Sequence, residues 1–185
     1  YGLQDITVGD SVISQTDLIR QLWLDNYYYG SIFSLQHKYK GTQWLTGGGW
    51  NRYDGGHYGK IIWSQTDIPK NYEWYNRDAK KTDFNIYTKL QQRISQRLDI
   101  FGDIQYRNIR YALNGFRDNP DLFIFNNYHF VNPKAGLTYS NNNWLAFVSY
   151  SIAAKDPNRD DFEAGAAQQP KPEKLQDVEM TVAGI

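Results

Sequence analysis

The sequence contains no cysteine among its 185 residues. This excludes disulfides, thiolate nucleophiles and cysteine-ligated metal sites, while both envelope and cytosolic proteins remain compatible with it. The 20 basic and 20 acidic residues give a formal net charge of zero. Nucleic-acid binding requires a clustered positive excess, so we expect no nucleic-acid partner.

Motifs of catalysis and metal binding are also missing. There is no G-x-S-x-G pattern, and Gly47–Gly49 is not followed by the lysine and hydroxyl residue of a phosphate-binding loop. His37, His57 and His129 lie on separate segments, without the two-histidine spacing of a zinc site. We therefore predict that the protein is not an enzyme and has no catalytic residue, no metal site and no cofactor.

Two acidic stretches are candidates for a calcium site. Asp118–Asp121 and Asp160–Asp161 carry carboxylates that could offer oxygen ligands to calcium. Neither has the regular spacing of a calcium-binding loop, so we expect solvated loop tips.

Long apolar runs are absent as well. No stretch approaches the roughly 18 apolar residues of a transmembrane helix, and the mean hydropathy is −0.69. The chain instead alternates apolar and polar residues at period two. In the clearest example one face carries Leu98, Ile100, Ile104 and Tyr106 and the other carries Asp99, Asp103, Gln105 and Arg107. Strands of a membrane barrel need only about ten such residues each.

Two kinds of connection alternate along the chain. Short polar turns are expected after Tyr39, Gln92 and Tyr139, and long connections follow Tyr53, Leu113 and Ala154. Outer-membrane barrels show this asymmetry, with short periplasmic turns and long extracellular loops. We predict an all-β fold: an antiparallel, up-and-down segment of a transmembrane β-barrel with about seven or eight strands.

The whole chain is expected to form part of one β-barrel domain. Residues 1–26 are predicted to be an irregular outer loop, with a short strand at 11–15 and one or two helical turns at 17–24. Residues 27–185 are predicted to form strand pairs with long extracellular loops near 54–80, 114–128 and 155–174. Because the sequence starts at Tyr1 without a leader and stops inside a strand-like pattern, we expect a piece of a longer protein.

The first long connection is rich in aromatic residues. Flat rings combined with hydrogen-bond donors suit a catecholate chelate or a sugar ring. The candidate ligand-binding residues on this extracellular loop are Arg52, Tyr53, His57, Tyr58, Trp63, Trp74 and Tyr75. Some of these are expected only to brace the loop or to belong to an aromatic girdle at the membrane interface.

Charged residues on the polar strand face suggest structural pairing. Arg107 and Arg110 lie close in sequence to Asp99 and Asp103. Charges on the inner wall of a barrel can pair and remain hydrated, so we expect a charge ladder there rather than a ligand site.

Three stretches resemble the barrel domain of TonB-dependent outer-membrane receptors, particularly those common among Bacteroidetes. They are residues 20–30 (RQLWLDNYYYG), 47–58 (GGGWNRYDGGHY) and 155–179, where KDPNRDDFEA precedes PKPEKLQDVE. In this family such an outer loop precedes a strand entry that Pro172, Glu173, Lys174, Leu175 and Glu179 fit. The usual glycine two residues after that glutamate is replaced here by Thr181.

The resemblance implies energised uptake of a scarce ligand across the outer membrane of a Gram-negative bacterium. The implied partners are the ligand, membrane lipid and the TonB complex, which acts through a plug domain that this chain does not contain. The cargo expected first is an iron–siderophore complex, with an oligosaccharide among the alternatives. Such receptors have barrels of about 22 strands, so this chain would supply barrel wall and some loop contacts.

Two other interpretations remain open from the sequence. A complete eight-stranded outer-membrane barrel, acting as an adhesin or a structural wall, would need little more than this length. A soluble carbohydrate-binding β-domain would fit the aromatic loops but not strand faces suited to lipid.

Overall fold

The computed structural model describes residues 3–117, 119–164 and 169–184. The strands are β1 (Ile6–Val8), β2 (Ser11–Ile13), β3 (Leu18–Tyr39), β4 (Thr42–Ser64), β5 (Tyr72–Arg93), β6 (Leu98–Asn114), β7 (Phe123–Ser140), β8 (Trp144–Lys155) and β9 (Glu173–Gly184). A single described helix, α1 (Arg159–Ala164), lies between β8 and β9. Among the described residues, no helix is both long and apolar enough to cross a membrane.

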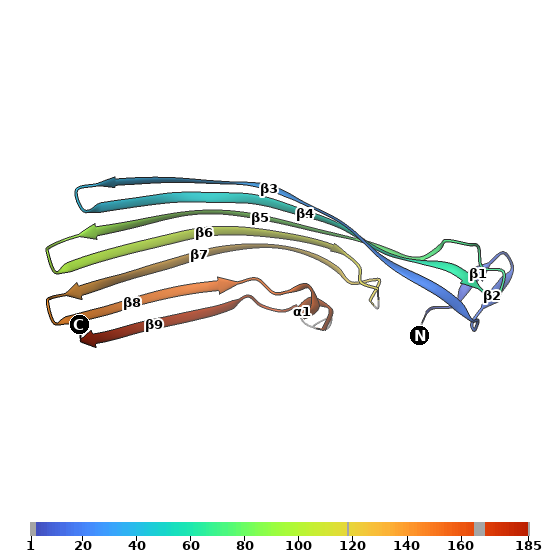
Figure 1. Ribbon diagram of the computed structural model, residues 1–185. Coiled ribbons are helices and arrows are strands. Elements are labelled where there is room, and N and C mark those ends of the chain that lie inside the picture. The colour runs from blue at the N-terminus through green and yellow to red at the C-terminus, as the bar shows by residue number, and fades with distance from the viewer. Residues whose placement is uncertain (1–2, 118, 165–168, 185) are drawn as a thin grey trace. The chain divides into compact units, whose positions relative to one another are not determined.

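The long strands form one seven-stranded sheet in chain order, β3-β4-β5-β6-β7-β8-β9, and β1 and β2 form a separate hairpin (Figure 1). The pairs β7–β8 and β8–β9 are antiparallel, with Leu137 opposite Val148 and Val148 opposite Met180. Each strand thus pairs with its sequence neighbours, as in an up-and-down meander. The predicted all-β, antiparallel fold is confirmed.

The three short turns occur where the sequence places them. The β3–β4 turn consists of Lys40 and Gly41, whose φ angles are 41° and 81°. Positive φ at both central residues is typical of the type I′ turn, whose twist matches that of the flanking strands. The other two short turns occupy residues 94–97 and 141–143.

The strands are longer than predicted at the end of the sheet opposite the three short turns. The expected loops at 54–80, 114–128 and 155–174 shrink to connections at 65–71, 115–122 and 156–172. Residues 1–26 are also more ordered than expected, because they contain β1, β2 and the start of β3. The expected helical turns at 17–24 are wrong, since Leu18 to Leu24 are extended in β3, whereas the short strand near Ser11 is confirmed as β2. In the acidic stretch at 160–161, Asp161 Oδ2 accepts a hydrogen bond from the backbone amide of Asn158 at 2.7 Å, next to α1. Asp118 of the other acidic stretch lies outside the described residues.

The chain divides into two compact units. The first unit comprises residues 1–28, 53–81 and 111–125, and the second comprises residues 29–52, 82–110 and 126–185. The first unit has an inward-packed apolar cluster of Ile6, Ile61 and Ile68, against which Val8, Ile13, Leu18, Tyr72 and Trp74 pack. This cluster fastens the β1–β2 hairpin to the ends of β4 and β5.

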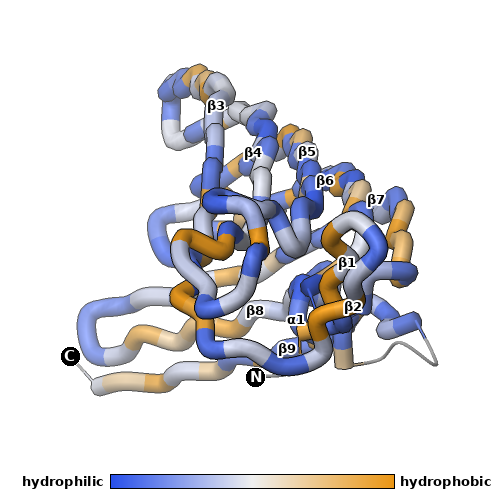
Figure 2. The backbone as a smooth tube through the Cα atoms, turned by 90° about the vertical axis from the view of Figure 1, so that its right-hand side faces the viewer, coloured by the Kyte–Doolittle hydropathy of each residue, from blue (hydrophilic) through white to orange (hydrophobic). Residues whose placement is uncertain are grey.

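The second unit carries its apolar side chains on an exposed sheet face, and hydropathy alternates along its strands (Figure 2). Directly opposed residues share a face, so the register defines what we call the apolar face. On β7, β8 and β9 it comprises Ala135, Leu137, Tyr139, Ala146, Val148, Tyr150, Val178, Met180 and Val182. Met180 is 71% exposed and Leu137 is 42% exposed. An exposed apolar surface of this extent is typical of proteins that contact a membrane or another protein.

The opposite face of the second unit is polar and contains an ion network. Arg107 Nε donates to both carboxylate oxygens of Asp83, at 3.2 and 3.0 Å, and Arg107 Nη1 lies 3.4 Å from Asp156 Oδ1. Arg93 pairs with Asp99 at 3.3 Å on the same sheet. Charge pairing is therefore present on this face. The predicted pairing of Arg107 with Asp99 was wrong, because Arg107 pairs with Asp83 and Asp156 and Asp99 pairs with Arg93.

Candidate ligand-binding site

The seven candidate residues lie on strands rather than on a loop. Arg52, Tyr53, His57, Tyr58 and Trp63 belong to β4, and Trp74 and Tyr75 belong to β5. The sequence prediction assigned the set to the extracellular loop near 54–80, in which Asp54, Gly55 and Gly56 are typical turn residues. A strand fixes side-chain direction, so these residues are held in defined pairs.

Tyr53 and His57 form the first pair. The Tyr53 hydroxyl donates to Asn26 Oδ1 at 2.7 Å and lies 3.2 Å from His57 Nε2. A tyrosine hydroxyl has one proton, so while Asn26 accepts it, His57 donates from Nε2. Gly55 permits this contact, because a Cβ there would lie 2.3 Å from the Tyr53 hydroxyl oxygen.

Tyr58 is braced by other residues of the first unit. Its ring stacks on Trp23 with centroids 6.2 Å apart and planes 6° from parallel. Lys60 Nζ lies 5.1 Å from the same ring centroid and forms an ion pair with Glu73 at 3.3 Å. These contacts fit the expectation that part of the aromatic set stabilises the protein rather than a ligand.

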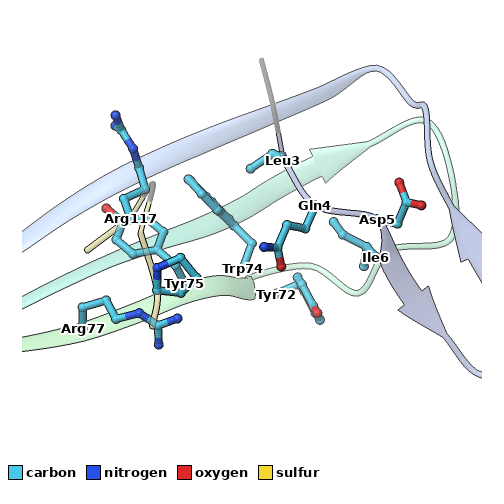
Figure 3. A pocket seen from close by; sticks show the side chains of 10 residues that line it. Leu3, Gln4, Asp5, Ile6, Tyr72, Trp74, Tyr75, Arg77 and Arg117 are labelled. Atoms are coloured by element: carbon cyan, nitrogen blue, oxygen red, sulfur yellow. The ribbon is translucent and has the colours of Figure 1, made fainter. Parts of the chain in front are cut away.

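Trp74 and Tyr75 line a cavity of about 280 Å³ in the first unit (Figure 3). Their rings meet edge to face at 4.4 Å, and both approach Gly59, where a Cβ would lie 2.5 Å from Trp74 Nε1 and 2.4 Å from Tyr75 Cε1. The other lining residues are Leu3, Gln4, Asp5, Ile6, Tyr72, Arg77, Arg117 and Pro120. Hence three chain segments converge on this cavity.

The remaining two candidates do not join these clusters. Trp63 is 52% exposed near the end of β4, and Arg52 belongs to the second compact unit. The predicted set is therefore divided among several places, and two of its members, Trp74 and Tyr75, line a cavity.

Sequence reasoning missed Gln4, Arg77 and Arg117 as cavity residues. Arg77 follows Tyr75 by two positions, the spacing of one strand face, but this pattern was hidden while the segment was taken as a loop. Gln4 and Arg117 come from distant segments, and no local pattern marks them.

No group of three or more His, Asp or Glu side chains gathers for a metal ion in the part of the chain that the structure describes. His129 lies within β7, where its Nδ1 is 2.7 Å from the Tyr106 hydroxyl. His57 is engaged with Tyr53, as described above. These two histidines therefore have protein partners of their own.

The comparisons with known proteins now identify the class. A family model described as "TonB dependent receptor-like, beta-barrel" matches residues 2–180, and the chain belongs to this family. The seven-stranded sheet is accordingly an antiparallel segment of a β-barrel of this family.

A solved structure described as "Copper transporter OprC" is similar with a TM-score of 0.71 and 11% sequence identity. The match covers 88% of this chain and 28% of that chain, so this chain spans little more than a quarter of the length of its structural neighbour. At this identity the similarity concerns the fold alone. No curated protein matches the sequence.

Proposed function

We propose that the chain is part of the barrel wall of a receptor that takes up a scarce ligand across the outer membrane of a Gram-negative bacterium, with energy delivered through TonB. The family match over residues 2–180 is the observation that carries this proposal. The exposed apolar face of β7, β8 and β9 supports it, because lipid is the solvent that such a face requires. The same features disfavour a soluble carbohydrate-binding domain and a separate small adhesin.

In this proposal the connections at 65–71, 115–122 and 156–172 lie outside the cell, and the short turns face the periplasm. The TonB complex would act through a plug domain outside this chain. The role is binding and transport rather than catalysis.

The cargo that we favour is an iron–siderophore complex. The support is chemical: the first unit combines flat aromatic faces with donors at Tyr53, His57, Trp74 and Tyr75, as a catecholate chelate requires. The structural neighbour carries the description of a copper transporter, so copper is a necessary competitor in the test, together with an oligosaccharide.

The test is uptake by the source bacterium of three labelled cargoes: a ferric siderophore, copper and an oligosaccharide. We expect deletion of the full-length receptor gene to abolish ferric-siderophore uptake and to spare the other two, and we expect deletion of tonB to abolish ferric-siderophore uptake as well. Loss of copper or oligosaccharide uptake instead would overturn the cargo and keep the receptor class. Normal uptake of all three in the tonB deletion strain, with a cargo still lost in the receptor deletion strain, would contradict energised transport.

A further inference from the structure

The apolar face of the second unit carries two adjoining depressions. The first has a volume of about 560 Å³ and is lined by residues that include Leu90 of β5 and Gly102 of β6. The second has a volume of about 450 Å³ and reaches Val178 of β9. Ala135 of β7 and Tyr150 of β8 line both depressions. The two depressions therefore join into one furrow that extends from β5 to β9.

The furrow is open at Gly102 because this position lacks a side chain. Ile100 and Ile104 flank Gly102 on the same face of β6, as the period of two requires. A Cβ built on Gly102 would meet nothing within 4 Å, whereas a Cβ on Gly136, which belongs to the opposite face, would lie 2.6 Å from the Phe101 ring. The protein thus covers Gly136 with a ring of its own and leaves Gly102 uncovered.

The side chains around the furrow suit a hydrocarbon ligand. Leu90 and Ile104 are apolar and are each 49% exposed. Two charged residues, Asp103 and Lys134, also border the first depression. Each is next to a furrow residue in sequence, so strand alternation directs its side chain to the polar face. The surface that a ligand meets in the furrow is therefore mainly apolar.

Two further observations disfavour a polar ligand. Thr88 borders the first depression, and its Oγ1 already accepts a hydrogen bond from Trp44 Nε1 at 2.8 Å. The strand β6 has hydrogen-bonded neighbours on both sides, so its backbone at the floor of the furrow leaves few polar groups for a ligand. A ligand that depends on hydrogen bonds would gain little here.

The length of the furrow matches a single lipid chain. From β5 to β9 it crosses four strand spacings, roughly 19 Å at about 4.8 Å each. One leaflet of a hydrocarbon core of about 30 Å has a depth of about 15 Å. Strands of a membrane barrel tilt by about 35–45°, so a furrow across them runs obliquely through the leaflet. An acyl chain of one leaflet can therefore follow it.

We propose that this furrow binds one acyl chain of a membrane lipid, with Gly102 and Ala135 on its floor. The inference rests on the proposed function, which places the apolar face against lipid, and it names the part of that face that retains a lipid. The furrow recognises the hydrocarbon chain, so the headgroup of the lipid does not decide the affinity.

The test uses the full-length receptor, depleted of lipid in an octyl detergent, and native mass spectrometry to count retained lipids. The two probes are dioleoyl phosphatidylethanolamine and dioleoyl phosphatidylglycerol, which have the same chains and different headgroups. We expect both to be retained with similar affinity, because burial of the chain supplies the binding free energy. Retention of neither probe, or of only one, would overturn the proposal. A receptor dimer that forms without lipid and is dissociated by Gly102→Leu would also overturn it, because a second copy would then occupy the furrow.

Two variants locate the binding. Gly102→Leu and Ala135→Leu each fill part of the furrow, and each should weaken lipid binding about tenfold, the effect of losing contact with about two methylene groups. The matched control is Ala146→Leu, which adds bulk to the same apolar face outside the furrow and should bind lipid as the wild type does. If Ala135→Leu does not fold, Gly102→Leu decides, since the space over Gly102 accommodates a side chain. Unchanged binding in Gly102→Leu, or an equal loss in Ala146→Leu, would overturn the assignment.

The uptake experiment separates this inference from the proposed function. If the receptor transports its cargo in a TonB-dependent manner but retains no lipid, the furrow assignment is wrong and the transport function stands. If lipid is retained and Gly102→Leu releases it, while uptake is independent of TonB, the transport function is wrong and the furrow assignment stands.

Discussion

The two compact units use apolar residues in opposite ways. In the first unit Ile6, Ile61 and Ile68 are each less than a tenth exposed and pack against one another. In the second unit Val178, Met180 and Val182 are each more than three-fifths exposed on one sheet face. The first unit therefore keeps water away from an internal apolar cluster, whereas the second carries its apolar residues on an exposed face, as the proposed contact with lipid requires. Both units contain strands with apolar residues, and they differ in whether those residues pack internally or lie on an exposed sheet face.

The largest expected effect concerns the polar face of the second unit. Arg107→Met removes the guanidinium that pairs with Asp83 and Asp156, whose side chains are 11% and 7% exposed. Removing one partner from such a network costs about 3–5 kcal/mol. Urea unfolding of the full-length receptor in lipid vesicles would measure the change in free energy.

Arg93→Met is the matched control for this network. Arg93 also pairs with an aspartate, Asp99, but its side chain is 64% exposed, and surface pairs contribute about 0–1 kcal/mol. If both variants lost the same free energy of unfolding, the Arg107 pairs would be no stronger than an exposed surface pair, and the predicted difference would be wrong.

A second substitution tests the apolar face. Leu137→Arg places a charge on the face proposed to meet lipid and should lower the free energy of unfolding by about 2–4 kcal/mol at a mid-membrane position. Thr138→Arg changes the next residue of β7, which points to the polar face, and should cost much less. The same vesicle unfolding assay distinguishes them. A larger loss for Thr138→Arg would reverse the assignment of the two faces.

Two glycine substitutions test how closely side chains pack on the sheet of the second unit. A Cβ on Gly136 would lie 2.6 Å from the Phe101 ring, which stacks on Phe147 with centroids 6.3 Å apart. Gly136→Ala should therefore cost about 1–3 kcal/mol by overpacking. A Cβ on Gly102 meets nothing within 4 Å, so Gly102→Ala should be close to neutral. Equal unfolding energies for both variants would contradict the close packing of Phe101 over Gly136.

The smallest expected effect lies in the first unit. Tyr53→Phe removes the hydroxyl that contacts Asn26 and His57, and a hydrogen bond of this kind contributes about 1 kcal/mol. Tyr139→Phe, on the apolar face, is the control and should leave stability unchanged. Hydrogen exchange of the β4 amides would detect the loss, and identical exchange in the two variants would contradict a structural role for the Tyr53 hydroxyl.

The sequence predicted the parts of this fold that depend on local rules. Period-two alternation identified the strands, and Lys40-Gly41 identified a tight turn whose φ angles are indeed positive. The strand ends were less predictable, because Asp54, Gly55 and Gly56 are turn-forming residues by type. In the structure they continue β4, since Gly55 accommodates the Tyr53 ring.

The sequence identified some of the residues that line the cavity but not the segments that come together around it. Trp74 and Tyr75 were predicted as ligand-binding residues of an aromatic-rich segment; the structure places them at a cavity, and whether they bind ligand stays a prediction. Their neighbours Gln4 and Arg117 come from other segments of the chain. Likewise Arg107 finds Asp83 and Asp156 at sequence separations of 24 and 49 residues. Such partners are set by strand order and register, which one sequence does not reveal.

Measuring whether each face of β7 meets lipid or water tests directly whether the sheet is part of a membrane wall. This chain has no cysteine, so the single substitutions Val131→Cys, Lys134→Cys, Leu137→Cys and Thr138→Cys each introduce one spin-labelling site into it, after any cysteine elsewhere in the full-length receptor has been replaced by serine. In full-length receptor reconstituted in vesicles, we predict that labels at 131 and 137 are relaxed by oxygen, which concentrates in lipid. Labels at 134 and 138 should be relaxed by a water-soluble nickel chelate. Relaxation of all four labels by the nickel chelate would contradict a lipid-facing sheet.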